Sequence, residues 1–168
     1  MRLMVFVPID RSEVFALRAQ LESGLVMRVG HAATASLMRS LGYDDTMLED
    51  AEFAALTHAG VRSVIIGHDE LRLVVAAEID RTDLDDTGDA YGTVTVKRLG
   101  WADVHALFVD EDAARSRVAE ARAAVQGHDL TFAVQQPTMA ALTDEHDLLW
   151  YAPEEVDDLQ HRRDGADR

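Results

Sequence analysis

The segment 144–159 constrains the fold most strongly, because a strand and the start of a helix follow each other there. Four apolar and aromatic residues, Leu148–Tyr151, stand between acidic groups, which is typical of a short strand. Pro153 suits the first turn of a helix, and Glu154 and Glu155 lie where the helix dipole favours negative charge. We therefore expect this strand to be internal, covered on both faces, and part of the folded core.

Hydrophobic spacing predicts further elements in the first half of the chain. Asp44 and Asp45 can cap a helix that begins near Thr46. Residues 61–66 fit a strand by propensity or a continuation of that helix to Gly67. The other predicted elements are a strand at 2–7, a helix from Asp10 to Gly24 with Val14, Leu17 and Leu21 inside, a strand or loop at 25–29, a helix at 32–41 and a strand at 71–78.

The second half opens with a predicted loop at 79–90, which contains five aspartates. Strands at 93–97 and 104–109 are joined by a short connection, which predicts an antiparallel pair. The remaining predicted elements are a helix ending at Gly127 with Ala114, Val118, Ala121 and Val125 inside, a strand at 130–134 and a helix at 137–143.

The order of these elements predicts the α/β class, with helices packed on a mixed β-sheet that includes an antiparallel pair. A chain of 168 residues suits a single domain. We expect that domain to cover 1–159 and the polar residues 160–168 to form a disordered tail.

The charge balance excludes several classes of partner. Sixteen basic and 31 acidic residues give a net charge of −15, which disfavours nucleic acid and anionic membranes. No stretch approaches the roughly 20 apolar residues of a membrane-spanning helix. The chain has no cysteine, which excludes disulfides and thiolate chemistry and fits a cytoplasmic location. A protein partner or a homo-oligomer stays open.

The histidines and aspartates predict neither a metal site nor a cofactor. None of the seven histidines forms a compact ligand pair, and His58 and His105 fit core positions. Read as a calcium loop that starts at Asp83, the aspartate-rich segment has Val94 where the last ligand, a glutamate, belongs. We therefore expect no divalent cation at 79–90.

Glu145, His146 and Asp147 are the best candidates for acid–base catalysis, because a carboxylate can set the tautomer and pKa of a histidine. Adjacent residues of an extended chain point to opposite faces, so the two acids would share a side that His146 does not. A solvated polar turn is therefore the favoured interpretation. Trp150 and Tyr151 are candidate binding residues, with core packing as the alternative.

Four segments of the chain are distinctive together: the opening strand and helix, Glu52–Leu56, Val74–Ala77 and the ending His146–Tyr151. With these segments, the chain resembles a family of small acidic actinobacterial proteins of unknown function. The resemblance implies one domain across the chain and a helix through 61–66. It implies no activity, cofactor or catalytic residue.

Two hypotheses of function follow. The first is a cytoplasmic, non-enzymatic binding or regulatory protein, because a well-specified core lacks a catalytic motif. The alternative is a small hydrolase-like enzyme that uses His146 with neighbouring carboxylates. A pocket that gathers His146, Glu145 and a second acid would favour the enzyme, whereas a flat surface there would favour binding.

Overall fold

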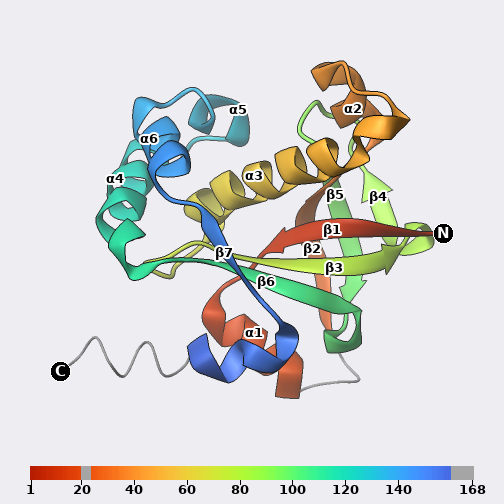
Figure 1. Ribbon diagram of the computed structural model, residues 1–168, viewed down its shortest axis with the longest axis horizontal. Helices are drawn as coiled ribbons and strands as arrows, with labels where there is room; N and C mark the ends of the chain where they lie inside the picture. The colour runs from red at the N-terminus through yellow and green to blue at the C-terminus, as the bar shows by residue number, and fades with distance from the viewer. Residues whose placement is uncertain (20–23, 160–168) are drawn as a thin grey trace.

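A computed structural model describes residues 1–19 and 24–159 of the chain, whose strands form one sheet (Figure 1). The strands are β1 Arg2–Pro8, β2 Leu25–Ala32, β3 Leu73–Asp80, β4 Leu84–Asp86, β5 Thr93–Leu99, β6 Val104–Asp110 and β7 Leu148–Tyr151. Their order across the sheet is β4-β5-β2-β1-β3-β6-β7, and neighbouring strands of the described chain all run antiparallel. The expected mixed sheet is thus antiparallel throughout this part.

Helices cover both faces of the sheet and extend beyond one end of it (Figure 1). The α-helices are α1 Arg11–Ala19, α2 Ala35–Leu41, α3 Leu48–Ile66, α4 Arg115–Val125, α5 Leu130–Ala133 and α6 Pro137–Glu145. The 3-10 turns are η1 Asp45–Met47, η2 Arg81–Asp83, η3 Trp101–Asp103, η4 Asp112–Ala114 and η5 Pro153–Glu155. This arrangement confirms the predicted α/β class with helices packed on a sheet.

The alternation of β1 separates two layers of core. Val5 and Val7 point to the face that α1 covers, where the final helical residues add Val156 and Leu159. Phe6 points to the opposite face and packs with Ala55 and Ala59 of α3 and with other small residues. A third cluster joins the C-terminal half of α3 to α4, α5 and α6, which gather at that end of α3.

The alternative left open at 61–66 is resolved in favour of a helix, because α3 continues to Ile66. Val61 and Val64 are buried in the cluster shared with α4, at a spacing that suits a helix face. The N–H of Gly67 bonds to the carbonyl of Ser63 and ends the helix. At the other end, Asp44 caps η1 by accepting a hydrogen bond from the N–H of Thr46.

The predicted antiparallel pair of strands 93–97 and 104–109 is wrong. β5 lies between β2 and β4, whereas β6 lies between β3 and β7. The sheet curves so that β5 approaches β3, and η3, which joins β5 to β6, also contacts β3. Arg2 of β1 donates a 2.9 Å hydrogen bond to Asp103 of η3. A short connection can therefore join strands that are not neighbours.

Two further predictions differ from the structure, and two others fall outside the described residues. Residues 79–90 are not all loop, because β4 pairs there with β5 at the register Asp86↔Val94. Residues 130–133 are the helix α5 and not a strand, because Asp129 caps the N–H of Phe132 and turns the chain. Leu21 and the expected tail at 160–168 lie outside the described residues.

Candidate functional site

His146 lies just after α6 and contacts a carboxylate that the sequence did not indicate. Its Nδ1 is 2.9 Å from Oε1 of Glu111, and its side chain is only 13% exposed. Glu111 belongs to the acidic run before α4. The start of a helix explains this run as well as a functional site does. No local spacing could have paired two residues so far apart along the chain.

Glu145 and Asp147 do not converge on His146. Arg117 of α4 donates two hydrogen bonds to the Glu145 carboxylate, at 2.7 and 3.0 Å. Asp147 is exposed to solvent. The structure therefore places His146 beside one acid, Glu111, and leaves the three sequence candidates without a common pocket.

β7 is an edge strand and not the internal, covered strand that its composition suggested. Leu148 packs against the α3 side and Tyr151 against the core on the α1 side. Leu149 is 38% exposed, and Trp150 is 60% exposed. An apolar run of this length fits an edge strand or an internal strand. The order of the strands, with β7 paired to β6 at the end of the sheet, decides between them.

A buried ion pair anchors the turn that leads into β7. Arg72, which comes just before β3, binds the Asp110 carboxylate through Nε and Nη2 at 2.9 and 2.7 Å. The Nη2 group also donates to the carbonyl of His146 at 2.9 Å. Both side chains are almost fully buried. The sequence held one signal for this pair, namely charged residues at the ends of two apolar strands.

A group of buried and half-buried polar side chains surrounds the carbonyl of Tyr91. Nδ1 of His31 and Nδ1 of His58 lie 2.9 and 3.2 Å from this oxygen, and Arg62 donates from Nε to Nε2 of His31 at 3.3 Å. A carbonyl can only accept, so both Nδ1 atoms carry hydrogen, and His31 is neutral because its Nε2 accepts. Asp89 holds the loop by accepting from the N–H of Tyr91 and of Thr93.

Burial lowers the pKa of His31 from its ordinary value of 6.5 to about 4, and burial also lowers the pKa of His58. The positive charge of Arg62 also lowers both pKa values, because it repels a proton on either ring. His58 is half-buried with its Nδ1 bonded, which fits the structural role that the sequence suggested, whereas the expected core position of His105 is wrong because its side chain is exposed. His31 was missed, because nothing local marks its burial in the sheet.

Acidification is expected to destabilise the protein through His31. The unfolded chain binds a proton near pH 6.5 and the folded chain near pH 4, so stability is complete above pH 6.5 and falls as the pH drops toward 4. The loss should reach about 3 kcal/mol, at about 1.36 kcal/mol per pKa unit. Urea unfolding of the wild type and of His31→Asn between pH 7 and 4 measures it. Equal slopes for the two proteins would exclude His31 as the cause.

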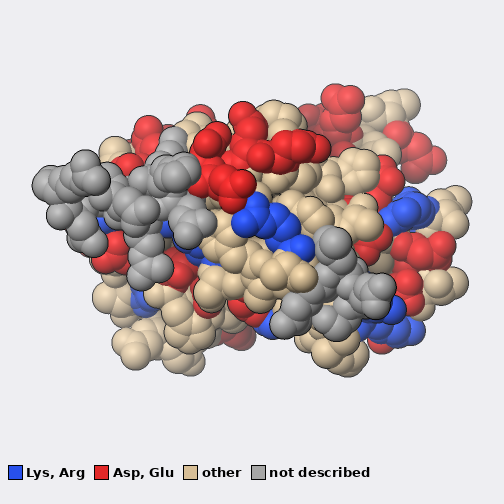
Figure 2. All heavy atoms as spheres, turned by 90° about the horizontal axis from the view of Figure 1, so that it is seen from below, with Lys and Arg blue, Asp and Glu red and all other residues tan. Residues whose placement is uncertain are grey.

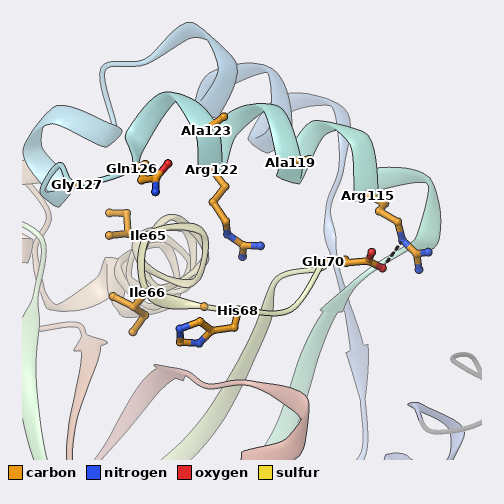
Figure 3. A pocket seen from close by; sticks show the side chains of 11 residues that line it. Ile65, Ile66, His68, Glu70, Arg115, Ala119, Arg122, Ala123, Gln126 and Gly127 are labelled. Atoms are coloured by element: carbon orange, nitrogen blue, oxygen red, sulfur yellow. Dashed lines mark ion pairs between the residues drawn. The ribbon is translucent and has the colours of Figure 1, made fainter.

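A cleft of about 550 Å³ lies between the C-terminal end of α3 and α4 (Figure 3). Ile65, Ile66 and alanines of α4 form its apolar wall. Arg122 points from α4 toward the end of α3, where Nε and Nη1 donate to the carbonyls of Val64 and Asp69. Arg115 pairs with Glu70 at 3.3 Å across the rim. Both arginines thus have structural partners, and His146 does not line this cleft.

The described residues hold no group of three or more histidines, aspartates or glutamates placed to bind a metal ion. In the same part of the chain, no helix combines the length and apolar character needed to cross a membrane.

The chain belongs to a family of unknown function, DUF6912, whose model matches residues 1–160. This confirms the resemblance to a family without a known activity. No curated protein and no solved structure matches the chain.

Proposed function

We propose that this is a non-enzymatic binding protein that takes an extended, basic segment of a protein partner along β7. The observation that carries the proposal is Trp150, a large aromatic side chain that is 60% exposed on an edge strand of the sheet. The chain has no cysteine, which supports a reducing compartment such as the cytoplasm as the place of binding.

The outer edge of β7 offers backbone hydrogen-bonding groups to a partner. β6 is the one strand that pairs with β7 in the described part of the chain. Alternate residues of an antiparallel edge strand direct their N–H and C=O groups away from the neighbour. An extended peptide can form hydrogen bonds with these groups and add a strand to the sheet.

The side chains of β7 supply anchoring area. Trp150 stands opposite Phe108 in the register with β6, and Leu149 adds exposed apolar surface on the other face. Tryptophan contributes large contact areas at protein interfaces and is enriched among the residues that dominate binding energy. An added strand could therefore bury apolar side chains on both faces of β7.

Charge selects the partner. Exposed acids flank β7, with Asp147 before it and Glu154, Glu155 and Asp158 after it. Figure 2 views the molecule from the side of α1, and acidic side chains outnumber basic ones on this face. A second copy of a chain with a net charge of −15 would be repelled, whereas lysine and arginine side chains would be attracted.

The alternative of a small hydrolase-like enzyme has one contact in its favour. Glu111 can orient His146 as a carboxylate orients the histidine of an acid–base pair. However, Glu145 is held by Arg117, and Asp147 is exposed beside the strand. This arrangement supports a structural role for His146 more than a converging catalytic group.

A synthetic peptide of alternating valine and lysine is the first probe of β7, with binding measured by fluorescence anisotropy. We expect it to bind, and we expect Trp150→Ala to weaken binding by at least about tenfold, as for the loss of an interface anchor. Raising the salt concentration should also weaken binding, because exposed charges are screened.

Phe53→Ala is the matched control, because Phe53 is also a large exposed aromatic side chain, at 68%, but belongs to α3 and not to β7. It should bind the peptide as the wild type does. A valine and glutamate peptide of equal length should not bind. If the basic peptide fails to bind, or binds Trp150→Ala as tightly as the wild type, the proposed docking on β7 is wrong.

A further inference from the structure

A second cleft, which we call the α2–β4 cleft, lies beside the opposite edge of the sheet from β7. Its cavity volume is about 590 Å³, within the range of small-molecule sites. Its lining includes Met38, Arg39, Tyr43, Arg81, Leu84 and Asp86.

The two arginines of this cleft differ from the other basic residues. Among the basic residues that the structure describes, Arg39 and Arg81 are the two whose side chains make no hydrogen bond or ion pair. Both are exposed. In a chain with 31 acids and 16 basic residues, two unpaired guanidinium groups at one cleft are an available anion-binding pair.

Local structure fixes the backbone at both arginines. Arg39 lies in the last turn of α2, which ends where Gly42 takes a positive φ of 70° and the N–H of Tyr43 bonds back to the Met38 carbonyl. Arg81 begins η2, where its N–H donates to the carbonyl of Met1 and Asp80 caps the turn. The two side chains therefore come from separate, well-anchored elements.

The rest of the lining suits an organic body. Met38, Leu84 and the half-buried Tyr43 provide apolar and aromatic surface. Asp86 is also part of the lining, and its Oδ1 accepts from the N–H of Gly88 at 2.8 Å. Asp45 lines the cleft as well, and neither acid forms an ion pair with the two arginines in the described part of the chain.

We propose that the α2–β4 cleft binds a small organic anion, with a phosphate or carboxylate group between Arg39 and Arg81 and an apolar or aromatic body against Tyr43 and Met38. Guanidinium groups match both oxyanions through paired N–H donors. The lining acids can accept hydrogen bonds from hydroxyl or amino groups of the ligand. This site is independent of β7, so each can fail without the other.

Phenyl phosphate, benzoate and phenol are the probes, with binding to the full chain measured by calorimetry. We expect phenyl phosphate or benzoate to bind in the millimolar range or tighter and phenol not to bind, and the tighter of the two identifies the anion class. Arg39→Gln and Arg81→Gln should each weaken binding roughly tenfold, the effect of losing a hydrogen bond to a charged group. Arg39→Lys should keep part of the affinity.

Arg18→Gln is the matched control, because Arg18 is a surface arginine of α1, paired with Asp157 away from the cleft. It should leave binding unchanged. Melting temperatures near that of the wild type would show that the arginine variants are folded. The proposal is overturned if neither anion binds, if the double variant Arg39→Gln with Arg81→Gln binds as the wild type does, or if Arg18→Gln weakens binding equally.

Discussion

Replacement of Asp110 by alanine is expected to lower the free energy of unfolding by about 3–5 kcal/mol. The Asp110 carboxylate accepts hydrogen bonds from the backbone N–H and the guanidinium of Arg72, and both side chains are buried. Without the carboxylate, a positive charge would stay buried without compensation. Urea unfolding followed by circular dichroism measures the change.

Asp112→Ala is the control for this experiment, because Asp112 is 60% exposed and its distance to Arg115 is 3.8 Å. Such a surface pair contributes about 0–1 kcal/mol. The double variant Arg72→Met with Asp110→Leu should recover much of the loss, although the His146 carbonyl would lose its donor. A loss below about 1 kcal/mol in Asp110→Ala would contradict the assigned role of the pair.

Truncation after Asp147 is expected to unfold the protein. It removes β7 together with the helical residues that follow, including Val156 and Leu159, which are 1% and 0% exposed in the core on the α1 face. Tyr151 packs against the same core. Burial of each such side chain contributes roughly 1.5–3 kcal/mol against a total stability of about 5–15 kcal/mol. Thermal unfolding of the shortened chain tests this expectation.

Two further variants show which residues cause the loss of stability. Truncation after Gln160 keeps every described residue and should melt like the full chain. Leu159→Ala should cost about 2–5 kcal/mol, as for other buried leucines. A cooperative transition near the full-length temperature after the cut at Asp147 would show that β7 is an appendage, and the core role assigned to Leu159 would then be wrong.

Elements specified by neighbouring residues could be predicted from the sequence. The helix α4 follows from its apolar spacing, and β1 follows from the pattern at 2–7. The junction from β7 to η5 follows from an apolar run and Pro153. The prediction failed at 130–133, where the cap Asp129 and a short loop outweighed an alternating pattern.

Contacts between distant segments were decided only by the tertiary structure. Alternation with a period of two shows which face of a strand is buried but not which strand lies beside it, so the sequence could not place β7 at an edge or separate β5 from β6. The same limit applies to the candidate sites. Glu111 meets His146, and Arg39 shares a cleft with Arg81, only because packing brings remote segments together. Local sequence determined the elements of this protein, and long-range packing determined its neighbours, edges and clefts.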